Sequence, residues 1–184
     1  MYILAIVGSP RLGGNTSYLA DQALRQATEL GARTEKIILS EYKVSPCLGH
    51  ENCSEFDSCV QQDDGIWILQ KFREADGIIL ATPVYYYDVS AWMKIFIDRN
   101  YFLYRHGEKC RAKTIGLIAV AGGAGIEDTV HTMNRFVNAS SFNVARDKRF
   151  IVTGYASSPG DVKNNHELIR EASNLGRQIV ESLK

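Results

Sequence analysis

Residues 2–16 read YILAIVGSPRLGGNT, a continuous apolar run followed by a loop of small and polar residues. The run 2–7 has the length and continuity of a strand that is buried on both faces. Beyond Thr16, apolar residues recur at helical spacing as far as residue 30. A core strand is therefore predicted to pass through a small-residue loop into the N-terminus of a helix.

The loop 8–16 predicts an anion site. The first backbone N–H groups of a helix have no partner within it, and the helix dipole favours an anion there. Arg11 adds a positive charge, and the short hydrogen-bonding side chains of the loop are Ser9, Asn15, Thr16 and Ser17. The loop lacks both the Gly-x-Gly-x-x-Gly pattern of dinucleotide-binding loops and the Gly-Lys-Ser/Thr of nucleotide triphosphatases. We therefore expect a phosphate cradle of another kind.

Length and composition indicate a single globular domain, residues 1–184. The chain has 21 basic and 21 acidic residues, and the net charge of zero argues against nucleic acid or a membrane surface as a partner. The N-terminal segment lacks the basic start of a signal peptide, and no apolar stretch is long enough to span a membrane. We expect a cytoplasmic protein whose four cysteines form no lasting disulfides.

Strand-like and helix-like patterns alternate along the chain. Strands are predicted at 2–7, 34–39, 77–81, 114–121 and 150–153, and helices at about 16–30, 64–73, after Ser90, at 126–139 and at 168–183. Residues 40–63 form an irregular insertion that contains three cysteines. Five βα units predict an α/β fold with a doubly wound, five-stranded parallel sheet in a three-layer sandwich.

Ligands of such sheets bind beyond the carboxyl ends of the strands, where the loops 8–16, 82–90 and 121–126 are expected to meet. The second loop contains Tyr85, Tyr86 and Tyr87 in succession. These rings form either a wall for a flat aromatic ligand or a contact with a neighbouring subunit. The glycines of the third loop, Gly122, Gly123 and Gly125, allow close approach of backbone to a ligand or simply a tight turn.

Two motifs together resemble the NADPH-dependent FMN reductase family of flavodoxin-like proteins. They are Gly8-Ser9-Pro10-Arg11 with Gly14-Asn15-Thr16, and Thr82-Pro83-Val84-Tyr85 followed by Ser90-Ala91, Lys94 and Phe96-Ile97-Asp98-Arg99. The resemblance implies that the FMN phosphate is held by Ser9, Arg11, Asn15, Thr16 and Ser17. It also implies that Pro83, Val84, Tyr85 and Tyr86 flank the isoalloxazine ring and that Gly122, Gly123 and Gly125 approach its polar edge. For Asp98 and Arg99 we expect a structural role in capping and subunit packing.

The same resemblance implies an FMN-dependent oxidoreductase. NAD(P)H would pass hydride to flavin N5, and a flavin, a quinone or a redox protein would accept the electrons. No catalytic protein residue is expected, because the flavin carries the reactive atom. The alternative is a flavodoxin-like or iron–sulfur flavoprotein electron carrier, which the net charge of zero disfavours, since such carriers are usually acidic. Family members imply a homodimer or homotetramer.

The insertion carries Cys47, His50, Cys53 and Cys59. This spacing is similar to the C-x2-C-x2-C-x5-C ligand set of the iron–sulfur flavoprotein branch, with His50 at the second position. Three interpretations stay open: a four-iron cluster with His50 as fourth ligand, a Cys3His zinc site, or a metal-free segment that packs against a partner subunit. Cys110 has no partner by spacing and is expected to be a buried free thiol.

Overall fold

The centre of the fold is a parallel sheet with the strand order β2-β1-β3-β5-β6. In the computed structural model, which describes residues 1–139 and 141–184, these strands are β1 (Tyr2–Val7), β2 (Arg33–Ile38), β3 (Gly77–Tyr85), β5 (Thr114–Ala121) and β6 (Arg149–Tyr155). All four pairings between neighbours in this order are parallel. The predicted five-stranded, doubly wound sheet is therefore confirmed.

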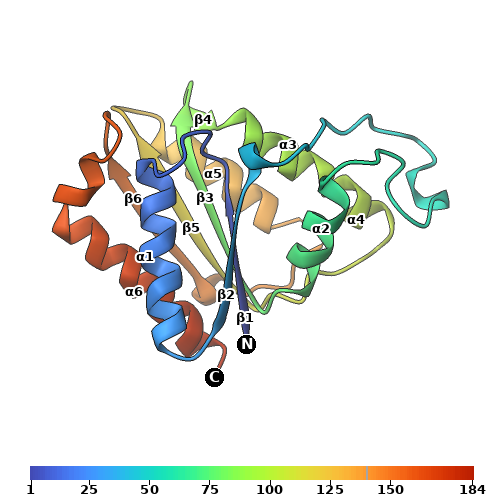
Figure 1. Ribbon diagram of the computed structural model, residues 1–184. Helices are drawn as coiled ribbons and strands as arrows, with labels where there is room; N and C mark the ends of the chain where they lie inside the picture. Colours follow the sequence, from blue (N-terminus) through green and yellow to red (C-terminus); the bar gives the residue numbers. More distant parts are fainter. Residues whose placement is uncertain (140) are drawn as a thin grey trace.

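Helices cover both faces of the sheet (Figure 1). On one side lie α1 (Asn15–Glu29) and α6 (His166–Ser182), and on the other lie α2 (Gly65–Glu74), α3 (Ala91–Arg99), α4 (Tyr101–Arg105) and α5 (Ile126–Val137). Each face has its own apolar core, and the side chains of β1 alternate between the two. Every residue of β1 is buried, as its unbroken apolar sequence predicted.

The third strand is longer than the predicted 77–81. β3 continues to Tyr85 and forms a hairpin with β4 (Asp88–Val89). The turn places Tyr86 at φ 48° and Tyr87 at φ 66°, in the left-handed region that two-residue hairpin turns of type I′ require. No residue pattern predicts this turn, because such positions usually hold Asn or Gly and here hold two tyrosines.

Ser90 caps α3 as predicted: its Oγ accepts a hydrogen bond from Met93 N at 3.2 Å. The same hydroxyl donates to Gly8 O at 2.6 Å, and Ser90 N donates to Thr82 Oγ1 at 3.0 Å. The start of α3 is thereby fixed to the ends of both β1 and β3. The single helix expected after Ser90 is in fact two, because α3 ends at Arg99 and α4 begins at Tyr101.

Residues 40–63 are irregular, as predicted, apart from 3-10 turns at Leu39–Glu41 and Cys53–Glu55. This stretch extends away from the sheet beside α3 and α4, in cyan in Figure 1. Within the described residues, no helix is both long and apolar enough to cross a membrane.

Candidate functional site

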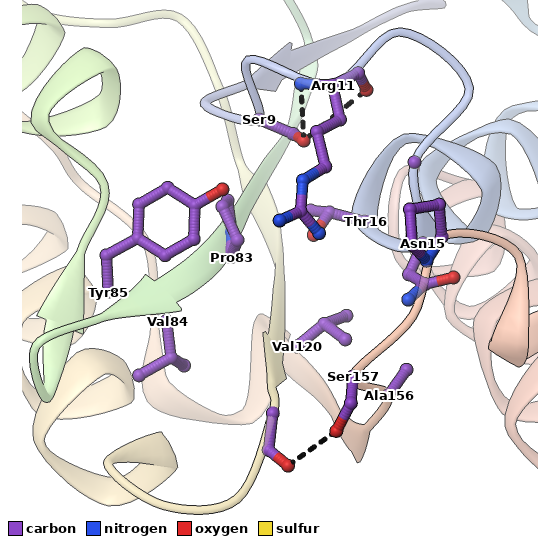
Figure 2. A pocket seen from close by; sticks show the side chains of 13 residues that line it. Ser9, Arg11, Asn15, Thr16, Pro83, Val84, Tyr85, Val120, Ala156 and Ser157 are labelled. Carbon is purple, nitrogen blue, oxygen red and sulfur yellow. Dashed lines mark hydrogen bonds between the residues drawn. The ribbon is translucent and has the colours of Figure 1, made fainter.

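A cavity of about 200 Å³ opens at the carboxyl ends of the strands (Figure 2). The three loops predicted to meet there do so, and a fourth loop, after β6, joins them. The residues that line the cavity are Ser9, Arg11, Gly14, Asn15, Thr16, Pro83, Val84, Tyr85, Val120, Gly122, Ala156, Ser157 and Pro159.

Hydrogen bonds between residues close in sequence hold the loop after β1 in a compact turn. Arg11 N donates to Ser9 Oγ at 3.2 Å, and Gly14 N donates to Arg11 O at 3.0 Å. A Cβ atom at Gly14 would lie 3.0 Å from both Cβ and O of Arg11, so this close turn favours glycine. The loop directs the Arg11 side chain into the cavity, with Pro83 and Tyr85 on one side and Thr16 and Asn15 on the other (Figure 2).

The N-terminus of α1 meets the cavity without a side-chain cap, since its N-cap residue is Gly14. The N–H groups of its first turn have no partners within the helix, and that turn contains no acidic residue. Arg11 adds a positive charge, and the lining residues in the described part of the chain include no carboxylate. This end of the sheet is therefore suited to an anion.

The side chains of two predicted phosphate ligands bond residues far from the loop after β1. Asn15 Nδ2 donates to Ser158 O at 2.8 Å, and Asn15 Oδ1 accepts from Gly160 N at 2.9 Å. Ser17 is buried outside the cavity lining, and its Oγ accepts from Lys36 Nζ at 3.2 Å. Asn15 thus joins the first loop to the loop after β6, which positions both around the cavity. For Asn15 and Ser17, direct contact with phosphate stays a prediction.

Only some of the residues predicted to contact the isoalloxazine ring line the cavity. Pro83, Val84 and Tyr85 line the cavity, whereas Tyr86 is fully exposed at the hairpin turn and lies outside the lining. Of the three glycines, Gly122 lines the cavity and Gly123 and Gly125 do not.

Gly125 instead makes room for the hairpin. Its φ is 87°, and a Cβ atom there would lie 2.6 Å from Tyr87 Cα. A side chain at this position would therefore push the hairpin away from the start of α5.

The fourth loop was not among the loops predicted from the sequence. Ser157 Oγ donates to Gly122 O at 2.9 Å, and Ala156 N donates to Ala121 O at 2.8 Å, so this loop is attached to the end of β5. The run Ser157-Ser158-Pro159-Gly160 directly after a predicted strand is a turn signal that could have revealed it.

The cysteine segment, defined as residues 45–63, contacts the C-terminal end of α3 at Arg99. Its three cysteines are free thiols; Cys53 is buried, and Cys47 and Cys59 are half-buried. Burial and the nearby charges of Cys59 and Cys47 raise the pKa of the Cys53 thiol. Three thiols and an imidazole match the chemistry of an iron–sulfur or zinc site. Their side chains do not converge, however: the described residues contain no group of three potential ligands arranged around one point.

Arg99 has a structural role, as expected, but its side chain packs within the chain and not at a subunit contact. Its side chain is 1% exposed and pairs with Asp63 of the cysteine segment at 2.7 Å. Asp98 pairs with Lys94 on the surface of α3 at 2.6 Å.

Cys110 is buried as predicted, and burial raises its pKa to about 12.

The strand order and the helices on both faces of the sheet define a flavodoxin-like α/β protein. This chain is similar in fold to an NAD(P)H:quinone oxidoreductase from Methanothermobacter marburgensis, with a TM-score of 0.72, 16% identity, and coverage of 96% of this chain and 98% of that one. It is also similar to a flavodoxin from the domain Archaea, with a TM-score of 0.64, 14% identity, and coverage of 100% and 99%.

Sequence comparison adds the family. Residues 1–157 match the family described as NADPH-dependent FMN reductase. The chain is also 38% identical to an iron-sulfur flavoprotein of Methanocaldococcus jannaschii over 190 residues, which cover 100% of this chain and 98% of that protein. The chain belongs to the NADPH-dependent FMN reductase family and is an oxidoreductase of that family.

Proposed function

We propose that the cavity binds FMN through its phosphate and that the protein uses NAD(P)H to reduce a flavin, a quinone or a redox-protein acceptor. The observation that supports this most is Arg11, which points into a cavity that also receives the uncapped N-terminus of α1. Family membership indicates that the anion is the phosphate of FMN. When bound, the flavin would supply the hydride-accepting atom, so no protein nucleophile is needed.

The phosphate would be held by Arg11, by the hydroxyls of Ser9 and Thr16 and by the first N–H groups of α1. Charge-assisted hydrogen bonds of this kind are shorter and stronger than neutral ones. Asn15 would act mainly by holding the loop after β6 against the first loop, because its amide group already bonds Ser158 and Gly160. Removal of Asn15 would therefore loosen the walls of the cavity, and it would also abolish any direct contact of Asn15 with phosphate.

The size of the cavity supports a binding mode in which only part of FMN is enclosed. Pockets that enclose a whole ligand typically measure about 300–1,000 Å³, whereas this one measures about 200 Å³. The phosphate and the chain next to it would occupy the enclosed part. The ring would lie at the open mouth, against Pro83, Val84, Tyr85 and Gly122, where NAD(P)H and the acceptor can reach it.

We further propose that Cys47, His50, Cys53 and Cys59 hold an iron–sulfur cluster or a zinc ion; the alternative is a metal-free segment, which agrees with side chains that do not converge. Support comes from the donor chemistry and from the relative in Methanocaldococcus jannaschii, which is named as an iron-sulfur flavoprotein. A cluster here would favour the second candidate function, an electron carrier.

A homodimer or homotetramer is also proposed, and exposed aromatic side chains such as Tyr86 and Tyr104 offer surface for such contacts.

The phosphate assignment is tested by titration of the flavin-free protein with FMN and with riboflavin, which lacks the phosphate, while the quenching of flavin fluorescence is followed. FMN is expected to bind more tightly than riboflavin. Arg11→Ala should weaken FMN binding about 10- to 100-fold, because a hydrogen bond to a charged group is worth about 1.5–3 kcal/mol, and should leave riboflavin binding unchanged.

Arg25→Ala is the matched control, since Arg25 lies on the exposed side of α1 and bonds Gln22 of the same helix. This variant should bind both flavins as the wild type does. Equal affinities for FMN and riboflavin in the wild type, or full retention of FMN affinity in Arg11→Ala, would rule out the proposed phosphate site.

A further inference from the structure

Two tyrosines form the turn between β3 and β4 in a backbone conformation that is unfavourable for them. The φ angle is 48° at Tyr86 and 66° at Tyr87. A bulky side chain is rare in this left-handed region, because its Cβ atom lies too close to the following carbonyl oxygen. Turns of this type usually hold Asn and Gly for that reason. The two tyrosines therefore make the turn less stable than its usual residues would.

The fold does not use the two rings to offset this cost. Tyr86 is 100% exposed and Tyr87 is 62% exposed, so most of their surface stays in water. An aromatic side chain stabilises a fold chiefly through the apolar area that it buries. Unfavourable backbone conformations are concentrated at active sites and ligand-binding loops. The exposed rings in this turn are therefore suited to contact another molecule.

The structure around the turn fixes its conformation. Tyr85 and Asp88 form a pair in the hairpin directly before and after the two tyrosines. Val89 N donates to Asp88 Oδ1 at 2.7 Å. Gly125, at the start of α5, lies against the turn, since a Cβ atom there would be 2.6 Å from Tyr87 Cα. The two rings are thus carried by a defined hairpin.

The hairpin lies at the mouth of the cavity. Pro83, Val84 and Tyr85 of β3 line the cavity immediately before the turn, whereas Tyr86 and Tyr87 are outside the lining. Figure 1 shows β4 at the same end of the sheet as the loop between β1 and α1. A ligand in the cavity would contact the strand before the turn. The rings of the turn are left to contact a second molecule outside the cavity.

The surface next to the turn is negatively charged. Asp88 is exposed directly after the tyrosines, and Glu127 and Asp128 are exposed in the first turn of α5, which packs against β4. The segments 82–89 and 126–129 contain no lysine or arginine. Carboxylates repel phosphate groups brought close to them. This surface therefore favours an uncharged ring over the phosphate-bearing part of a nucleotide or a flavin.

We propose that Tyr86 and Tyr87 form a stacking surface for an uncharged, planar electron acceptor of the quinone class. This inference rests on the proposed function and deepens it, because it selects one class of acceptor and assigns its binding to residues outside the cavity. A stacked aromatic pair typically strengthens binding by about 2- to 12-fold beyond the effect of buried area. The strained turn thus trades stability of the fold for an exposed binding surface.

The test is equilibrium dialysis of the FMN-loaded, oxidised protein without NAD(P)H. The probes are hydroxymethylanthraquinone, which is uncharged, and anthraquinone sulfonate, which is an anion. Tyr86→Asn/Tyr87→Gly removes both rings and supplies the residues that the turn prefers. This double variant should bind the uncharged probe about 5-fold or more weakly than the wild type. It should also unfold at a higher urea concentration and keep wild-type affinity for FMN.

The matched control is Tyr86→Phe/Tyr87→Phe, which keeps both rings and should bind the uncharged probe as the wild type does. The charge is tested with Glu127→Gln/Asp128→Asn. At low ionic strength this variant should bind anthraquinone sulfonate about 2- to 5-fold more tightly than the wild type. Its affinity for the uncharged probe should not change.

The outcomes separate this inference from the proposed function. If the wild type binds no FMN, the proposed function is wrong and the inference falls with it. If the FMN-loaded wild type binds the anion as tightly as the uncharged probe, the FMN site stands and the inference is wrong.

Equal affinity of the wild type and Tyr86→Asn/Tyr87→Gly for the uncharged probe would also overturn the inference. A lower mass of that variant in light scattering would then assign the rings to a subunit contact. A loss of FMN affinity by the same factor as the loss of probe affinity would instead assign the rings to the flavin, and the stacking role toward an acceptor would again be wrong.

Discussion

The proposed FMN cavity and the cysteine segment lie at opposite ends of α3 and are built in different ways. The cavity is formed by loops that leave the ends of parallel strands, and its parts are fixed by bonds such as Ser90 Oγ to Gly8 O. The cysteine segment has little regular structure, and charged side chains of α3 and α4 hold it. The geometry of the cavity therefore follows from the sheet, whereas that of the segment depends on a few individual residues.

Arg99→Met is expected to have the largest effect on stability and to act on the cysteine segment. The substitution leaves the Asp63 carboxylate buried without its partner, which typically costs about 3–5 kcal/mol. The free energy of unfolding, measured with urea, should fall by that amount. The Asp63→Asn/Arg99→Met double variant should recover most of the loss. A loss below about 1 kcal/mol in the single variant would mean that water or another group compensates the charge.

Ser90→Ala should have a smaller effect on stability and should act on the proposed FMN cavity. It removes the N-cap of α3 and the hydrogen bond to Gly8 O. Loss of a helix cap costs about 0.5–2 kcal/mol, so the urea midpoint should fall and FMN binding should weaken with it. Ser54→Ala, at an exposed position of the cysteine segment, is the control and should change neither. An unchanged midpoint in Ser90→Ala would show that the cap does not hold the two loops together.

The rate of alkylation should distinguish a thiol of the cysteine segment from the buried thiol of Cys110, without any change in stability. Burial raises the pKa of Cys110 to about 12, so only about one part in 10⁴ of this thiol is ionised at pH 8, at one decade per pH unit. Iodoacetamide should therefore modify the half-buried Cys47 in the folded protein and leave Cys110 untouched until urea is added. Peptide mass spectrometry reads both sites, and equal labelling of the two in the folded state would contradict this difference.

The same contrast explains what could be predicted from the sequence. The strands, the loop 8–16 and the Ser90 cap were predictable because their signals are local: an unbroken apolar run, a cluster of small residues and a capping serine. The Tyr86-Tyr87 turn was not, because it lacks the usual turn residues. The bond of Asn15 to Ser158 joins residues 143 positions apart, and that of Arg99 to Cys59 joins residues 40 apart. Contacts of this kind depend on tertiary packing and leave no local pattern.

Rapid mixing of the FMN-loaded protein with NADPH and, separately, with NADH under anaerobic conditions tests the proposed function most directly. If the cavity holds FMN with its ring open to the nucleotide, the absorbance of oxidised flavin should disappear with at least one of the two. The FMN-loaded Arg25→Ala variant should behave in the same way. A protein that binds FMN but keeps its flavin oxidised with both nucleotides would show that it is not an NAD(P)H-dependent reductase.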